Sequence, residues 1–146
     1  MIAINEFLVS AEPGKVFPLL CPVREYEWIP TWKCDMILSK SGLNEKGSIF
    51  KTENSYGAKT MIWTTQEFDP STYTVRFTNF ASSGFIVNLK INLFETEKPK
   101  ACKAVWRYEF IPVSEEGDKA VAEISKKEVE KGIKKLGLLM EKYLSK

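Results

Sequence analysis

Hydrophobic and polar residues alternate with a period of two in several segments of the first 113 residues, which predicts a chain built mainly of β-strands. The clearest case is residues 73–78, where Tyr73, Val75 and Phe77 share one face, while threonine and arginine occupy the other. One-sided alternation is typical of an antiparallel sheet with one buried and one solvated face. We predict seven strands within residues 1–10, 33–42, 47–54, 60–69, 73–80, 84–97 and 100–113.

Three details of the pattern lie outside this regular alternation. In the first strand Ile2 and Ile4 are apolar and, after a one-residue slip, so are Phe7 and Val9. Ser10 is then a candidate N-cap for a short helix, which the prolines of residues 11–22 keep from becoming long. Residues 21–33, with two tryptophans, one tyrosine and two prolines, are predicted to form a broken helical connection.

The spacing changes to three and four residues near the C-terminal end, which predicts a single helix of about 26 residues. Asp118 is its expected N-cap. Gly132 and Gly137 lie inside this helix, and each costs ~1 kcal/mol relative to alanine. Its apolar positions are Val121, Ile124, Val129, Ile133, Leu136, Met140 and Tyr143 or Leu144.

Composition narrows the function classes. The 146 residues fit a single domain, 1–146. A net charge of +2, from 21 basic and 19 acidic residues, is too balanced to predict nucleic-acid binding. No apolar run approaches the ~20 residues that cross a bilayer, so no membrane insertion is predicted, and the absence of a recognisable signal peptide favours a cytoplasmic location.

The chain contains no histidine and only three cysteines, with no Cys-x-x-Cys pair. This composition excludes Ser-His-Asp and Cys-His catalysis and predicts neither a metal site nor a cofactor. Chemistry would depend on carboxylates, lysine, tyrosine, cysteine or water.

The order of elements predicts an α+β fold with one curved antiparallel sheet. It resembles the helix-grip fold of the START/Bet v 1-like (SRPBCC) superfamily, including its polyketide cyclase/dehydrase-like members. The segments that carry the resemblance are VSAEPGKVFPLL, YEWIPTWK, TTQEFDPSTYTVRFT and the C-terminal helix. The resemblance implies a curved seven-stranded sheet around the long helix, two short helices after the first strand, and a cavity between sheet and helix.

The inward faces of this fold offer candidate ligand contacts, and the alternative for each residue is that it only fills the core. Trp28 and Trp32, with Tyr26, would close the mouth of the cavity or seal the core there, and Tyr56 would form an exposed flap over the other rim. The predicted ligand-binding residues are Trp28, Trp32, Met61, Trp63, Phe77, Asn79, Phe85, Val87, Leu89, Trp106, Tyr108, Ile133, Leu136 and Met140.

The predicted function is binding of a small hydrophobic or aromatic molecule, such as a lipid, sterol or polyketide, by a monomer or homodimer. One alternative is a polyketide cyclase/dehydratase-type enzyme, with Tyr108 and Glu67 as candidate catalytic groups. For Glu67 the favoured interpretation is that it lies at a strand end and faces water. A second alternative is a protein-interaction domain like the co-chaperone members of the superfamily.

Overall fold

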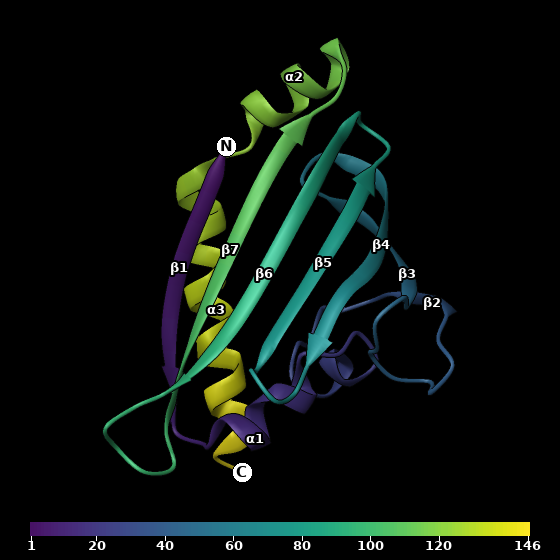
Figure 1. Ribbon diagram of the computed structural model, residues 1–146. Coiled ribbons are helices and arrows are strands. Elements are labelled where there is room, and N and C mark those ends of the chain that lie inside the picture. Colours follow the sequence, from purple (N-terminus) through teal and green to yellow (C-terminus); the bar gives the residue numbers. More distant parts are fainter.

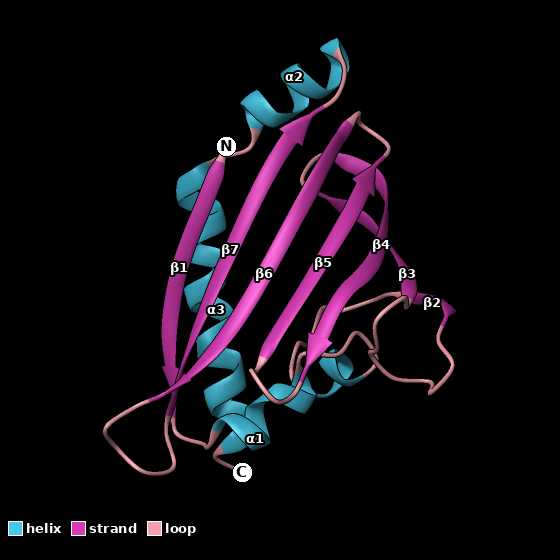
Figure 2. Ribbon diagram, viewed as in Figure 1, coloured by secondary structure: helices cyan, strands magenta, loops and turns pink.

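The computed structural model, which describes residues 1–146, contains one antiparallel sheet of seven strands in the order β1-β7-β6-β5-β4-β3-β2. Figures 1 and 2 show the strands side by side, with β1 and β2 at the two edges. The seven predicted strands are confirmed. Their bounds are β1 Ile2–Val9, β2 Asp35–Leu38, β3 Ile49–Ser55, β4 Ala58–Asp69, β5 Thr74–Ala81, β6 Phe85–Glu95 and β7 Cys102–Pro112.

Helices cover one face and both ends of the sheet. The longest, α3 (Lys126–Leu144), crosses behind it, and α2 (Glu115–Glu123) lies at the end where β7 finishes (Figure 1). Between β1 and β2 the chain forms α1 (Pro13–Val16) and the 3₁₀ turns η1 (Phe17–Leu19) and η2 (Arg24–Glu27). The Tyr143 hydroxyl of α3 donates to Glu27 at 2.6 Å, which ties η2 to the end of the long helix.

The C-terminal helix is two helices, so the prediction of one continuous helix with Asp118 as its N-cap was wrong. Ser114 caps α2 by accepting from the Gly117 amide, and Ser125 caps α3 by accepting from the Glu128 amide. Ile124 between them has extended backbone angles. Serine followed three residues later by glutamate is a recognised helix start. At Ser125 this signal begins a new helix, although the apolar repeat continues across the break.

The first strand is regular, so the predicted one-residue slip was wrong. Ala3 pairs with Tyr108 and Phe7 pairs with Ala104, and both side chains face the core. Asn5 fills the intervening inward position and donates from Nδ2 to the Glu130 carbonyl of α3 at 2.9 Å. A polar residue on the buried face produced the apparent slip. Ile2 and Ile4 therefore lie on the exposed face.

The N-cap predicted for the first helix was also wrong. Glu12, not Ser10, precedes α1, and its side chain makes no capping bond. Pro13 takes the first helical position, where a missing amide proton costs nothing, so the short helix starts without a side-chain cap.

Two glycines of α3 have different surroundings, and one of them borders the site. At Gly137 an added Cβ atom would lie 2.4 Å from Cγ of Phe7, so the helix backbone packs tightly against β1 there. At Gly132 an added Cβ would meet nothing within 4 Å. The two glycines lie on different faces of the helix, so Gly137 faces β1 while Gly132 faces open space. No helix of the structure is both long enough and apolar enough to cross a membrane.

Candidate functional site

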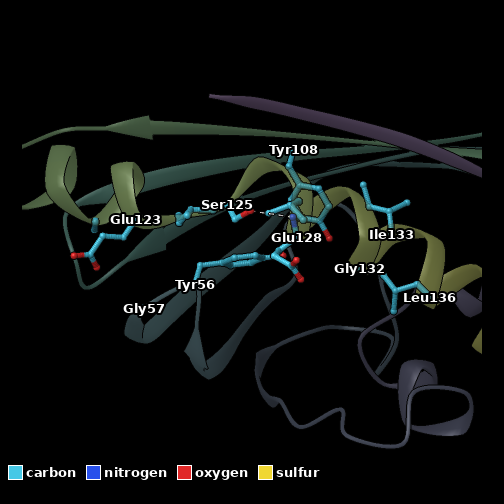
Figure 3. A pocket seen from close by; sticks show the side chains of 12 residues that line it. Tyr56, Gly57, Tyr108, Glu123, Ser125, Glu128, Gly132, Ile133 and Leu136 are labelled. Atoms are coloured by element: carbon cyan, nitrogen blue, oxygen red, sulfur yellow. Dashed lines mark hydrogen bonds between the residues drawn. The ribbon is translucent and has the colours of Figure 1, made fainter.

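An open cavity of about 640 Å³, which we call the outer chamber, lies beside the N-terminal half of α3. Tyr56 and Gly57, in the turn between β3 and β4, line it together with Tyr108 of β7. Figure 3 shows both tyrosine rings beside the first turns of α3. The helical wall contributes Ile124, Val129, Gly132, Ile133 and Leu136, and the exposed side chains of Glu123 and Glu128 lie at the rim.

A second cavity of about 200 Å³, the inner chamber, adjoins the first. The two share three lining residues, Tyr56, Tyr108 and Leu136, which therefore form the boundary between them. Most of the inner wall is apolar. It consists of Ile29, Trp32, Phe50, Trp63, Phe77, Leu89 and Trp106, with Glu25, Thr52 and Ser55 as the additional polar residues.

Aromatic packing fixes the walls of the inner chamber. The rings of Phe50 and Trp63 stack with their centroids 5.6 Å apart, and Phe77 meets Phe50 edge to face at 5.8 Å. Trp106 and Tyr108 stack at 6.4 Å on β7. Rings held in such pairs have little rotational freedom, so the cavity surface is formed before any ligand arrives.

Three of the four tryptophan N–H groups have a hydrogen-bond partner within the protein, and one does not. Trp28 donates to the Leu19 carbonyl at 3.0 Å, Trp32 to the Pro22 carbonyl at 2.7 Å, and Trp63 to the Thr52 hydroxyl at 2.9 Å. Trp106 Nε1 is buried and has no hydrogen-bond partner. A buried N–H group without a partner costs free energy, so this donor destabilises the folded protein.

Glu25 supplies a carboxyl group to the inner chamber. In a 3₁₀ turn residues three apart lie above one another, so Arg24 and Glu27 share the outer face of η2 and pair there at 2.9 Å. Glu25 consequently faces the interior, with 9 % of its surface exposed. Burial raises the pKa of Glu25 to about 8, so its carboxyl group is mostly protonated at pH 7. The Arg24 guanidinium and the Tyr143 hydroxyl instead lower the pKa of Glu27 to about 2.

The two tyrosines at the boundary are neutral hydroxyl groups. Burial raises the pKa of Tyr56, and burial together with the nearby Tyr56 and Glu25 raises that of Tyr108 further. The Tyr56 ring packs against Tyr108 and Phe110, with centroids 6.2 Å and 5.2 Å away, so it folds inward and is not the exposed flap predicted from the sequence. Tyr56 has a φ of +51°, a conformation unfavourable for a bulky residue, which the tight two-residue turn imposes.

Comparison with known proteins identifies the architecture. No protein-family model and no curated protein matches the sequence. Among solved structures, a major latex-like protein from Panax ginseng superposes with a TM-score of 0.72 at 12% identity, covering 98% of this chain and 96% of that one. Norcoclaurine synthase from Thalictrum flavum gives 0.68 at 14%, covering 95% and 85%, and has also been solved in complex with dopamine and hydroxybenzaldehyde. This chain has the START/Bet v 1-like fold.

A further START/Bet v 1-like neighbour is a two-domain protein. The di-domain ARO/CYC protein of the BE-7585A biosynthetic pathway matches with a TM-score of 0.70 at 14% identity. The match covers 99% of this chain but 46% of that protein, so the chain spans about half its length. The predicted helix-grip fold is thereby confirmed.

Within this START/Bet v 1-like fold, about half of the predicted ligand-binding residues line the chambers. Trp32, Trp63, Phe77, Leu89, Trp106, Tyr108 and Leu136 line the inner chamber, while Ile133 lines the outer one. Six others line neither chamber and are buried in the core: Trp28, Met61, Asn79, Phe85, Val87 and Met140. Asn79 differs from the rest because neither side-chain polar atom has a partner.

The structure does not bring Glu67 into either chamber. Strict alternation would point it inward after Thr65, which is buried. The register of β4 against β5 shifts between these two residues, so Gln66 is an extra residue in a β-bulge. Glu67 is thereby turned to the surface, where it pairs with Arg76 at 3.0 Å.

Sequence reasoning missed Glu25 and Phe50. Glu25 lies in a 3₁₀ turn too short for any hydrophobic period, so the pattern assigns it no direction. A usable signal was present, since Arg24 and Glu27 have the spacing of a surface ion pair and leave Glu25 on another face. Phe50 belongs to a predicted strand, but only pairing with Trp63 places it in the chamber.

Proposed function

We propose that this protein binds a small apolar or aromatic molecule in the inner chamber, which the ligand reaches through the outer chamber. The observation that carries the proposal is an interior space of about 200 Å³ walled by interlocked aromatic rings and bordering an open cavity. Concave, mostly apolar sites with a few convergent polar groups are typical of small-molecule binding. Glu25, Thr52 and Ser55 provide those polar groups.

The fold neighbours add support. Norcoclaurine synthase has been solved with dopamine and hydroxybenzaldehyde, both small aromatic molecules. A shared fold does not transfer an activity, but a neighbour solved with small aromatic molecules agrees with the mostly apolar cavity in this chain.

A second candidate function is proton-transfer catalysis of the cyclase/dehydratase type. It is favoured by Glu25, because a carboxyl group with a pKa of about 8 can both donate and accept a proton near neutral pH. Tyr108 would orient the substrate from the chamber boundary. If the protein is such an enzyme, Glu25→Gln should abolish turnover while substrate still binds, whereas unchanged turnover would remove this candidate.

Filling the outer chamber tests the binding function. Gly132 faces open space, so Gly132→Phe should place a ring in the cavity without displacing neighbours. We expect this variant to weaken binding of the neutral fluorescent probe N-phenyl-1-naphthylamine at least tenfold in a fluorescence titration. Gly132→Ala, which adds one methyl group at the same position, is the matched control and should bind as the unmodified protein does.

Two outcomes would contradict the proposal. One is the absence of saturable probe binding to the unmodified protein. The other is equal affinity in Gly132→Phe and Gly132→Ala, because the probe would then bind outside the chambers.

A further inference from the structure

The charge of the chambers is one-sided. Glu25 is the one ionisable carboxyl group of the inner chamber, and no lysine or arginine lines either chamber. The rim carries two more carboxylates, Glu123 and Glu128. Lys131 approaches Glu128 at 3.6 Å, but both side chains are about two-thirds exposed, so solvent weakens this pair. A route bordered by carboxylates and lacking cations favours entry of a positively charged molecule.

The walls around Glu25 strengthen this preference. Trp32, Trp63 and Trp106, with Phe50 and Phe77, line the same chamber as the carboxyl group. The faces of aromatic rings are negative, and they attract ammonium groups most strongly where water is excluded. A carboxyl group within an aromatic enclosure therefore combines two features that stabilise an organic cation, and no cationic side chain lines the chamber to stabilise an anion.

We propose that the inner chamber binds an organic ammonium ion with an aromatic or apolar body, with Glu25 as its counter-ion and the tryptophan rings as its walls. This inference rests on the proposed ligand-binding function and specifies its ligand class.

No other charged group competes with the ligand for Glu25. Tyr108 of β7 and Tyr56 of the β3–β4 turn face it across the chamber, and burial keeps both hydroxyl groups neutral. Cys34, which also lies close enough to interact electrostatically, has a raised pKa because it is partly buried, so its thiol is neutral as well. Arg24 and Glu27, on the outer face of η2, pair with each other.

Binding of such a cation should release a proton. In the empty protein Glu25 is mostly protonated below pH 8 because it is buried. A bound ammonium ion stabilises the carboxylate, so the proton leaves to solvent as the ion pair forms, and total charge is conserved. Affinity for a permanently charged ligand should therefore rise about tenfold per pH unit up to pH 8 and level off above it.

A matched pair of probes tests the inference by isothermal titration calorimetry. (4-Hydroxyphenyl)trimethylammonium and 4-tert-butylphenol have the same shape and the same hydroxyl group, but only the first is charged. We expect the cation to bind at least tenfold more tightly at pH 7, where the hydroxyl groups of both probes are protonated, and to release close to one proton at pH 6.5. Glu25→Gln should lose this preference while still binding 4-tert-butylphenol. Glu67→Gln, which removes the same charge from the surface, should change neither affinity.

The contradicting outcomes separate this inference from the proposed function. Equal binding of the two probes, tighter binding of the neutral carbonyl compound acetophenone, or an unchanged cation preference in Glu25→Gln would overturn the ammonium assignment and leave a neutral-ligand site. Failure of these probes and of N-phenyl-1-naphthylamine to bind would overturn both proposals. The pH dependence in the unmodified protein decides the question even if Glu25→Gln does not fold.

Discussion

At the scale of single residues, Glu25 is a buried carboxyl group whose protonation state depends on folding. A buried carboxylate without a cation is costly, so the group stays protonated and its pKa rises from the ordinary value of 4.5 to about 8. The folded protein therefore holds a proton that the unfolded chain releases at neutral pH. Folding and proton binding are linked at this residue.

Stability should fall as pH rises between 4.5 and 8. In this range Glu25 is protonated in the folded state and ionised in the unfolded state, so its contribution is complete below pH 4.5 and is lost toward pH 8. The limiting slope is about 1.4 kcal/mol per pH unit. Urea unfolding of the unmodified protein and of Glu25→Gln at pH 5, 6, 7 and 8 measures it. The difference in unfolding free energy between the two proteins should shift steadily in favour of the variant, and parallel profiles would contradict the raised pKa.

Asn79 gives a second prediction at the residue scale. It is fully buried in β5, and neither its amide nitrogen nor its oxygen has a partner. Because each unsatisfied buried polar group costs about 1–3 kcal/mol, Asn79→Leu should raise the unfolding free energy by roughly that amount, less any cost of overpacking. Thermal unfolding followed by circular dichroism measures the change.

Asn88→Leu is the control for this substitution. Asn88 accepts a hydrogen bond from the Thr78 hydroxyl at 2.9 Å, so its replacement should not stabilise the protein. A fall in stability of Asn79→Leu greater than that of Asn88→Leu would mean that Asn79 is hydrogen-bonded to an internal water or ligand.

Residue directions could be predicted wherever a regular strand determined them. Phe77, Leu89, Trp106 and Tyr108 reached the chamber as the alternation indicated. Glu25 could not be placed, because a 3₁₀ turn has no usable period. Glu67 faces water, as the favoured interpretation had it, although alternation alone put it near the inward face, because a single inserted residue at a bulge reverses the faces that follow. Bulges depend on the pairing of two strands, which one strand's sequence does not reveal.

At the scale of elements, the two glycines of α3 have opposite roles. Gly132 borders empty space, while Gly137 brings the helix backbone against Phe7. Gly132→Ala should stabilise the protein by about 0.5–1 kcal/mol through helix propensity. Gly137→Ala should destabilise it by roughly 1–3 kcal/mol, because the added methyl group collides with β1.

Guanidinium unfolding of the two variants under identical conditions tests this assignment. The pair controls for the propensity effect, since both variants replace glycine by alanine inside the same helix. Stabilisation by both substitutions would show that α3 does not pack closely on β1 at Gly137.

Element types were predicted more completely than element boundaries. Seven strands and a covering C-terminal helical segment follow from the periodicity. The break at Ser125 was missed because Ile124 and Val129 maintain an apolar repeat across it, while the interruption comes from local capping. In β1 the inward-facing Asn5 interrupts the apolar pattern. Its side-chain amide is nevertheless satisfied in the core by a hydrogen bond to α3.

For the molecule as a whole, the strands differ in length and burial across the sheet. β6 and β7 are eleven residues each and lie inside the sheet, whereas β2 has four residues, lies at the edge and is mostly exposed. Native-state hydrogen exchange should therefore be slowest in β6 and β7 and fastest among the strands in β2.

A bound ligand should reduce this difference. The inner chamber borders β3 and η2, which are less protected than the central strands. Saturating ligand is therefore expected to slow exchange there more than in β6 and β7. Exchange followed by mass spectrometry with and without N-phenyl-1-naphthylamine tests this. Uniform protection of all strands, or protection limited to the exposed face, would argue against an interior site.

The pairing of β1 with β7 also affects how the chain can acquire its shape during synthesis. Ile2 of β1 lies opposite Glu109 of β7. More than a hundred further residues must therefore be synthesised before β1 can pair with β7. The hairpins from β3 to β7 can assemble as they emerge, but β1 joins late, and α3 must close over it later still. Until α3 has packed on the sheet, the residues that will line the chambers form an exposed apolar surface. A nascent chain at this stage is expected to bind chaperones.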